Sequence, residues 1–500
     1  MSIYSSDTNL IEHIASNCSY VLRKSINNSG VNIFSMKFTV SYTLVNVIAV
    51  CILATSGDIT MSWTSPMYPK LYSNDTSINP LGRSITEDED SWIGSLINVG
   101  AIVGPLPFGF IGERFGRKIG LLCIAIPHVV SYLTMAFAKE VYLFYFGRIL
   151  GGIAVGGGYT LLPMYIAEVS DEMKRGFYSV FLGIFWGFGN FLPYLIGPFL
   201  SVMWFNVVLA CFPVTFFIVF LMFGVETPHY LVGKGDTGKA EKVLMLLRSK
   251  SKEGVQKELM QIKEGCNKNE VGHFKDILLN PGQRKALFIA LAFITFQQFS
   301  GMNAITFYLE PIFKASGSSL PSDISSLIAG AVIFITSFLT PALVSFYSRN
   351  AVSLVSIVGM ALPLGMLGAF FYALDNNMNV ENIMWMPLAS LILVILTYQI
   401  GFSVLPWTIS SELFSKDTKH IAASFVSITC WVGSFVVTKF FRDMTNLLGN
   451  AGTFLFFSGS CLLCAVFVVV YVPETRGKTL IEIQKMLQRK ISMISVVSHN

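Results

Sequence analysis

The sequence predicts an all-α membrane protein with twelve transmembrane helices in two six-helix bundles. Of its 500 residues, 53% are hydrophobic and only 13% are charged, whereas soluble proteins carry about 25% charged residues. The mean hydropathy of +0.60 agrees with this. The apolar residues also fall into runs of about 20, the length that crosses a bilayer as a helix. These observations exclude a soluble enzyme and a single-span receptor.

Twelve apolar runs separated by polar residues predict the membrane-spanning helices in order. The first six are expected near residues 38–64, 92–112, 119–138, 141–166, 177–199 and 203–225. The second six are expected near residues 285–309, 324–347, 351–374, 384–410, 420–441 and 452–472. Between the two groups lies a stretch rich in Lys and Glu, which predicts a short helical linker.

These runs divide the chain into a cytoplasmic tail, a bundle, a cytoplasmic helical linker, a second bundle and a second cytoplasmic tail. The expected bounds are 1–37, 38–225, 226–284, 285–472 and 473–500. With both termini in the cytoplasm, about 28 of the 35 Lys and Arg residues fall on the inner side. We therefore expect a multi-pass protein of the cell membrane. Asn74, in an Asn-Asp-Thr triplet of the first outer loop, is a candidate glycosylation site.

Several other functions find no support in the sequence. The basic residues are spread over short loops without interleaved aromatic residues, so no nucleic-acid partner is expected. Cys461 and Cys464 lie in an apolar run that offers no further ligand, so we expect no metal site there. No His, Cys or carboxylate cluster occurs at catalytic spacing in the spans, so neither an enzyme nor a cofactor is expected.

Charged residues at the inner ends of the spans repeat between the two halves. Glu168 and Arg175 follow the fourth span, and Glu412 and Lys419 follow the tenth at the same interval, with an offset of 419 − 175 = 244 residues. Ionisable groups in a membrane cost several kcal/mol unless they are paired, at least about 2.5 kcal/mol each. We interpret these residues as a charge network that closes the cytoplasmic side. The alternative is a set of interfacial charges satisfied by water and lipid headgroups.

Four further charged residues are assigned to the same network. Glu113 and Arg117 lie in the short loop between the second and third spans, Arg148 lies within the fourth span, and Glu474 leaves the twelfth. Glu226 leaves the sixth span in the same way, with an offset of 474 − 226 = 248 residues.

The seventh span contains three carboxamide side chains in an otherwise apolar helix, followed by two aromatic residues. They are Gln297, Gln298, Asn303, Phe307 and Tyr308. Carboxamides offer donors and acceptors together, which suits sugar hydroxyl groups, and aromatic rings suit the apolar face of a sugar. Gln298 and Asn303 align poorly on a straight helix, but a break at Ser300 and Gly301 would bring them to one cavity. The alternative is polar contact between helices.

Three residues in other spans join this group of candidates. Gln399 lies in the tenth span, and Trp407 follows it beside Pro406, where a kink and a large aromatic ring could act as hinge and lid. The alternative is that Trp407 only anchors the helix at the membrane interface, where tryptophans are common. Asp58, a carboxylate within the first span, is a candidate proton carrier.

At these residues the sequence resembles the sugar porter family of the major facilitator superfamily, from about residue 41 to residue 480. The similar segments are Gly112–Lys118, Pro163–Arg175, Gln297–Asn303 and Pro473–Gly477, and Trp63–Pro66 is most like the insect facilitated trehalose transporter group. The resemblance implies two bundles around a central cavity that opens to alternate sides. It also implies that Gln297, Gln298, Asn303, Gln399 and Trp407 contact the sugar and that the charge network latches the inner side.

The sequence departs from this family in three places that affect function. Ser403 and Val404 stand where the family has prolines and glycines before Trp407, so that helix is expected to be less mobile. The second-half loop at Ser348–Asn350 lacks most of the expected charge, so one latch partner is expected to be missing. Gly183 stands where many relatives have a glutamine, so the first half should offer fewer hydrogen bonds to the sugar.

The leading interpretation is a facilitative transporter of a neutral sugar, either trehalose or a hexose. A proton-coupled symporter that uses Asp58 and a non-transporting sugar receptor are the alternatives. The expected partners are a small-molecule sugar and the lipid bilayer, and one chain carries both bundles, so a monomer would suffice.

Overall fold

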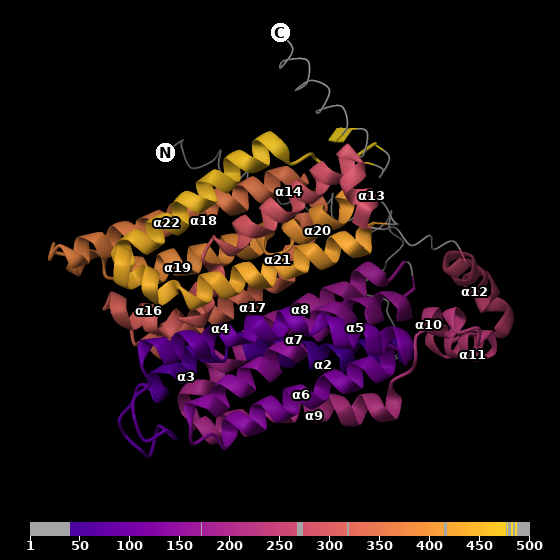
Figure 1. Cartoon of the computed structure of the whole chain (residues 1–500), viewed down its shortest axis with the longest axis horizontal. Helices are drawn as coiled ribbons and strands as arrows, with labels where there is room; N and C mark the ends of the chain where they lie inside the picture. The colour runs from indigo at the N-terminus through magenta and orange to yellow at the C-terminus, as the bar shows by residue number, and fades with distance from the viewer. Residues whose placement is uncertain are drawn as a thin grey trace, which may run out of the picture.

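Two groups of helices lie side by side in the computed structural model (Figure 1). The structure describes residues 41–171, 173–267, 274–317, 320–414, 418–476, 478, 482–483 and 486–487, and the elements in these residues are helices. Helices α2–α9 form the first bundle and α14–α22 the second, with α10–α12 at one end of the molecule. We call this end the linker end and the opposite end the far end. The tail expected over residues 1–37, and most of the one expected over 473–500, lie outside the described residues.

The first bundle contains long helices and a few short ones. Its elements are α2 (Tyr42–Ser62), α3 (Thr64–Leu71), α4 (Glu87–Val103), α5 (Pro105–Arg114), α6 (Arg117–Ala136), α7 (Val141–Val169), α8 (Arg175–Ile196), η1 (Gly197–Phe199) and α9 (Val202–Phe223).

The second bundle contains more breaks. Its elements are α14 (Pro281–Gln298), α15 (Met302–Phe307), α16 (Leu309–Ser316), α17 (Ser322–Phe346), α18 (Arg349–Asp375), η2 (Glu381–Ile383), α19 (Met386–Thr397), η3 (Tyr398–Phe402), α20 (Leu405–Leu413), α21 (Lys419–Lys439) and α22 (Phe441–Tyr471).

Four short helices connect the bundles: α10 (Pro228–Gly233), α11 (Thr237–Arg248), α12 (Lys252–Asn267) and α13 (Phe274–Leu279). The side chain of Asp236 accepts a hydrogen bond from the backbone N–H of Lys239 and so caps α11. Residues 268–273 of this stretch lie outside the described residues.

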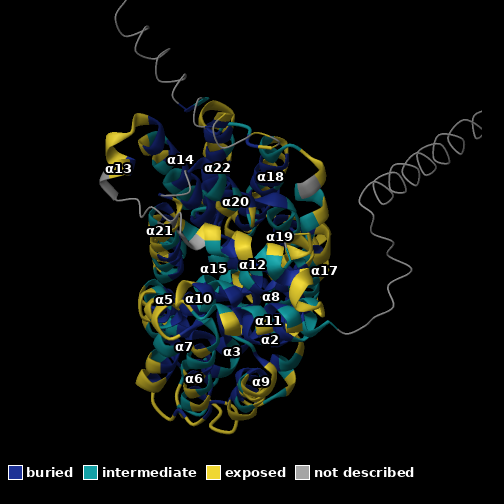
Figure 2. Ribbon diagram, turned by 90° about the vertical axis from the view of Figure 1, so that its right-hand side faces the viewer, coloured by how far each residue is buried: buried dark blue, intermediate teal, exposed yellow. Residues whose placement is uncertain are grey.

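Twelve helices are long and apolar enough to cross a membrane. Viewed from the linker end, buried residues lie between the helices, and many exposed residues lie around the rim (Figure 2). Large apolar side chains such as Leu106 and Leu463 are among those exposed, as expected for a surface that faces lipid. The sequence therefore predicted the number and order of the spans correctly.

Two helices extend beyond their apolar runs. α4 begins at Glu87 instead of near 92, because Thr86 and Glu89 form a capping box that starts the helix in a polar segment. α22 begins at Phe441 instead of near 452 and bends at Gly449, where φ is 71°. Hydropathy locates the apolar part of a helix, and these polar turns lie outside it.

Glycines allow two helices of the first bundle to pack closely. A Cβ added at Gly152 of α7 would lie 2.0 Å from the carbonyl oxygen of Ile97 on α4, and one added at Gly100 would lie 2.2 Å from that of Ile149. Only glycine fits at such separations, as in other membrane helix pairs. This close approach places α7 beside α2 and α4 at the centre of the bundle.

Candidate functional site

The seventh span is broken at the position that the sequence indicates. α14 ends at Gln298, and α15 starts after Gly301, which has a φ of 79°. A Cβ at Gly301 would lie 2.4 Å from the ring of Phe457, so both the backbone and the packing require glycine. The break brings Asn303 to Gln298, and the Nδ2 of Asn303 donates a hydrogen bond to Oε1 of Gln298 over 2.6 Å.

Gln297, Gln298 and Asn303, which we call the carboxamide cluster, also bind the helices around them. Nε2 of Gln298 lies 3.3 Å from Oε1 of Gln297 and 3.2 Å from Sγ of Cys430 on α21. Nδ2 of Asn303 also donates to Oγ of Ser434 over 2.9 Å. The cluster therefore joins α14 and α15 to α21, and a ligand that bound there would exchange these contacts for its own.

Gln297 has a separate structural partner. Its Nε2 donates to the carbonyl oxygens of Phe402 over 2.6 Å and of Ser403 over 3.2 Å. In a regular helix the Phe402 carbonyl would accept the N–H of residue 406, but Pro406 has none. Gln297 thus satisfies a backbone group that the proline leaves without a partner, which matters inside a membrane.

The tenth span is irregular in the same region. The turn Tyr398–Phe402 is a π-helix, and α20 starts again at Leu405, so the irregular segment begins before Pro406. Gln399 lies in this π-turn and is half-buried, and Trp407 is 37% exposed. The structure places both residues near the carbonyls that Gln297 binds.

Phe307 and Tyr308 do not present open faces. Both side chains are fully buried, and Tyr308 stacks between the rings of Tyr68 and Phe441, with centroids 5.2 Å and 5.0 Å away. The carbonyl of Phe307 accepts a hydrogen bond from Thr64 over 3.1 Å. In this conformation the two aromatic residues join the bundles at the far end, so the expectation that they offer flat faces to a sugar is corrected.

Each bundle carries a charged cluster at the linker end. In the first, NH2 of Arg117 lies 3.3 Å from Oε1 of Glu168, and its NH1 donates to the Gly112 carbonyl over 2.8 Å. The hydroxyl of Thr227 donates to Glu168 over 2.5 Å. Oε1 of Glu226 accepts the backbone N–H of Arg117 over 2.9 Å at the start of α6.

The second cluster repeats these contacts. NH2 of Arg349 lies 3.4 Å from Oε1 of Glu412, and its NH1 donates to the Val344 carbonyl over 2.7 Å. Glu474 accepts the backbone N–H of Arg349 over 3.2 Å and the hydroxyl of Ser348 over 2.5 Å. From the sequence, we expected the loop Ser348–Asn350 to lack a latch partner. The structure corrects this, because Arg349 of that loop pairs with Glu412.

Burial and hydrogen bonding act differently on the two equivalent glutamates. Burial raises the pKa of the Glu226 carboxyl above its ordinary value, although backbone N–H groups of Thr227, Lys118 and Arg117 act in the opposite direction. Burial also acts upward on the pKa of Glu474, but the Ser348 hydroxyl and backbone N–H groups outweigh it and leave that pKa lowered.

Other members of the predicted network lie elsewhere. Arg148 is fully buried, and its Nε donates to the Ile93 carbonyl over 2.8 Å, while its NH1 donates to the Thr60 carbonyl. It precedes Glu168 by 168 − 148 = 20 residues on α7, which is about 30 Å along a helix. Arg148 therefore ties α2, α4 and α7 together toward the far end and is not part of the linker-end network.

The remaining residues of the network are exposed. Glu113, Arg175 and Lys419 lie on the surface at the linker end. The two charged clusters each lie within one bundle, so among the described residues these ion pairs do not join the bundles at the linker end in this conformation.

The ion pairs between the bundles lie at the far end, and further contacts lie nearer the centre; neither was foreseen from the sequence. Oδ2 of Asp90 at the start of α4 lies 2.9 Å from NH2 of Arg442 on α22, and Oδ1 of Asp88 lies 2.8 Å from Nζ of Lys439 on α21. Asn98 accepts a hydrogen bond from Ser434 over 2.8 Å. The acidic run at 87–90 and the basic residues at 439 and 442 were the available signal.

A buried acid lies at the same end. The backbone N–H of Glu310 on α16 donates to Oγ of Ser65 over 3.0 Å, which joins the bundles at a further point. Burial, aided by the negative charge of Asp323, raises the pKa of Glu310 to about 7, and Lys70 and Lys314 offset part of this rise. We call the group of contacts made by Asp88, Asp90, Glu310, Lys439 and Arg442 the far-end seal.

No group of three or more metal-binding side chains occurs in the described part of the chain. Asn74 is exposed in the loop before α4 at the far end.

Comparison with known proteins identifies the family to which this chain belongs. Residues 50–487 match the family described as Sugar (and other) transporter. The facilitated trehalose transporter Tret1-2 homolog of Drosophila sechellia is 34% identical over 421 residues, which cover 83% of this chain and 85% of that protein. Tret1-1 of the same species is 33% identical over 440 residues. These cover 88% of this chain but 51% of Tret1-1, so the chain spans about half the length of that relative.

Solved structures show the same fold. The inward open conformation of the xylose transporter XylE from E. coli has a TM-score of 0.70 and 22% sequence identity, and the match covers 88% of this chain and 99% of XylE. XylE bound to 6-bromo-6-deoxy-D-glucose, described as a major facilitator superfamily protein, has a TM-score of 0.68 and 22% identity. The fold is therefore that of the major facilitator superfamily, and the family match over residues 50–487 shows that this chain belongs to the sugar (and other) transporter family.

Proposed function

We propose that this protein is a facilitative transporter that carries a neutral sugar, trehalose or a hexose, across the cell membrane by alternating access. The carboxamide cluster is the observation that carries the proposal. It places donors and acceptors that match hydroxyl groups at a break in a helix, beside the second irregular span. The similarity to a facilitated trehalose transporter supports trehalose as the substrate of this protein.

Charge supports the orientation that we propose. We assign the linker end to the cytoplasm, together with both termini, because most Lys and Arg residues would then lie on the inner side. The far end would face outward, where the exposed position of Asn74 fits a glycosylated loop. One chain contains both bundles, so a monomer would suffice for transport.

Alternating access requires that the far-end seal opens when the linker end closes. Arg175 and Lys419 are the first residues of α8 and α21, where the helix dipole disfavours positive charge. We assign them the role of pairing with carboxylates of the opposite bundle when the linker end closes. Glu113, Arg117, Glu168, Glu412 and Glu474 would then act as the latch together with Arg349.

Uptake of labelled trehalose and glucose into proteoliposomes tests the proposed function. The protein should equilibrate at least one of these sugars with saturable kinetics, and it should need no ion gradient. The absence of saturable uptake of both sugars would contradict the proposal. Accumulation above equilibrium under an acid-outside gradient would replace it with proton-coupled symport.

A further inference from the structure

A second polar group lies in the first bundle, where α2, α7 and α8 meet. Asp58 is only 5% exposed, and its Oδ1 accepts hydrogen bonds from Nδ2 of Asn190 over 2.8 Å and from the hydroxyl of Tyr159 over 3.2 Å. Oδ1 of Asn190 accepts the hydroxyl of Ser62 over 2.6 Å, which fixes the orientation of the amide. Close packing holds this arrangement, because a Cβ at Gly189 would lie 2.5 Å from the Thr55 carbonyl.

One oxygen of this carboxylate is left without a partner. Oδ2 of Asp58 is buried and accepts no hydrogen bond from the described residues. A buried carboxylate oxygen without a donor is costly, and in a membrane segment it marks a functional position. A ligand that donates hydrogen bonds would remove this cost.

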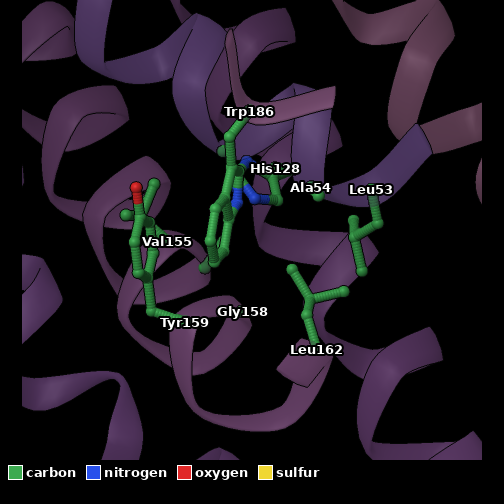
Figure 3. Close-up of a pocket in the computed structure, with 10 residues that line it drawn as sticks. Leu53, Ala54, His128, Val155, Gly158, Tyr159, Leu162 and Trp186 are labelled. Atoms are coloured by element: carbon green, nitrogen blue, oxygen red, sulfur yellow. The ribbon is translucent and has the colours of Figure 1, made fainter. Parts of the chain in front are cut away.

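Flat aromatic surfaces lie beside Asp58. Tyr159 stacks on Trp186 with ring centroids 5.0 Å apart and planes within 8°. Figure 3 shows both side chains at a small cavity that His128 also lines. Tyr159, Trp186 and Asn190 are half-buried, so part of each remains accessible.

The aromatic pair connects this group to the carboxamide cluster across the interface between the bundles. The ring of Tyr159 meets the edge of Trp431 on α21, with centroids 5.7 Å apart. Trp431 follows Cys430, whose sulfur lies 3.2 Å from Nε2 of Gln298. The two polar groups thus lie on opposite bundles with one aromatic contact between them.

We propose that Asp58 and Asn190 form the first-bundle half of the sugar site, in which the carboxylate accepts hydroxyl groups of the sugar and Trp186 packs against its apolar face. An ionised carboxylate only accepts hydrogen bonds, so it pairs with hydroxyl donors, and such charge-assisted bonds are strong. Asn190 and Tyr159 both donate to Oδ1 of Asp58, which leaves Oδ2 available to a hydroxyl group of the sugar. This inference rests on the proposed function and makes the recognition of the sugar depend on both bundles.

Binding of deoxy sugars to the full-length protein in proteoliposomes tests the inference. Each analogue replaces one hydroxyl group by hydrogen, and its affinity is measured for the wild type and for Asp58→Asn. The wild type should bind the sugar about tenfold or more tightly than Asp58→Asn does. The analogue that lacks the hydroxyl bound by Asp58 should lose affinity in the wild type and little further in Asp58→Asn, because the two changes remove the same contact.

Two variants complete the experiment. Thr160→Ala, on the same helix as Tyr159, removes a hydroxyl whose hydrogen bond within the described residues goes to the Gly156 carbonyl of its own helix over 3.1 Å, and it should leave every affinity unchanged. If Asp58→Asn does not reach the membrane, Asn190→Ala serves in the same comparison, because Asn190 holds the carboxylate in place.

Three results would overturn the inference in different ways. Equal losses for every analogue in the wild type and Asp58→Asn would show that Asp58 does not touch the sugar, while the proposed function stands. Unchanged affinity in Asp58→Asn together with the loss of proton-driven accumulation would assign Asp58 to proton transfer. A wild type that binds none of the sugars would contradict the proposed function itself.

Discussion

At the scale of single residues, the three carboxamides of the seventh span have different roles: Gln298 and Asn303 are candidates for sugar binding, and Gln297 binds a backbone carbonyl. The sequence predicted that a helix break brings Gln298 and Asn303 together, because Ser-Gly between polar residues is a local signal. It did not predict that Gln297 satisfies the carbonyl left free by Pro406, because that pairing joins residues 105 positions apart. Arg148 was misplaced for a similar reason, since its partners are backbone carbonyls of other helices and carry no sequence signal.

Gln298→Ala and Asn303→Ala should each weaken sugar binding by about 1–3 kcal/mol, the cost of a lost hydrogen bond in a desolvated site. Gln297→Ala should instead destabilise the protein without sugar by a similar amount, because it leaves the Phe402 carbonyl without a donor. Binding curves and thermal unfolding of the three variants separate these effects. If both Gln298→Ala and Asn303→Ala bind sugar with wild-type affinity, the carboxamide cluster is not part of the sugar site.

Glu310 should make the far-end seal sensitive to pH. A carboxyl group whose pKa is raised to about 7 in the closed state contributes stability below its ordinary pKa, and this contribution is lost as the pH rises through 7. The seal should therefore weaken between about pH 5 and 8, by about 1–3 kcal/mol if opening exposes Glu310 to water.

Glu310→Gln should remove this dependence while it keeps the size of the side chain. Thermal stability measured across the same pH range compares the variant with the wild type. A pH profile that is the same in both proteins would show that Glu310 does not control the seal.

At the scale of helices, the sequence located the twelve spans and the break in the seventh, but it missed the π-turn of the tenth. Apolar runs mark a membrane helix because every buried peptide group is satisfied within it. The π-turn Tyr398–Phe402 depends on contacts with other helices, such as the hydrogen bond from the backbone N–H of Phe402 to Ser356 over 2.9 Å. Such turns cannot be inferred from hydropathy, and here they adjoin the candidate site.

Gly301→Ala tests the break in the seventh span. The new Cβ would clash with the ring of Phe457 at a positive φ, so the protein should lose about 1–3 kcal/mol of stability and bind sugar less tightly. Gly459→Ala is the matched control, because a Cβ there meets nothing within 4 Å. Thermal unfolding and sugar binding of both variants provide the comparison. Equal behaviour of the two would mean that the break is not needed.

At the scale of the whole molecule, the repeat of charged residues was predictable and the contacts between the bundles were not. Matched spacing identified the two linker-end clusters because duplication preserves intervals along the chain. The far-end seal joins acidic residues at 88 and 90 to basic residues at 439 and 442, and no repeat relates them. The described contacts between the bundles lie toward the far end and at the centre, while the linker-end clusters are internal to each bundle, as expected for a carrier closed at the far end.

Asp90→Asn should favour opening of the far end. The buried carboxylate of Asp90 pairs with Arg442 and accepts a hydrogen bond from the hydroxyl of Tyr308. Replacing this carboxylate by an amide should destabilise the state with a closed far end by about 1–3 kcal/mol. Transport should persist in Asp90→Asn, because Asp90 belongs to the far-end seal and not to the proposed sugar site.

Alternating access itself is tested most directly by two distances measured with spin labels in the full-length protein, in a background without reactive native cysteines. One pair, at Ile78 and Leu447, spans the far end, and the other, at Met173 and Leu279, spans the linker end; all four positions are exposed. In Asp90→Asn relative to the protein with Asp90, the far-end distance should lengthen and the linker-end distance should shorten. Distances that both stay the same, or both change in the same direction, while sugar transport continues would contradict alternating access.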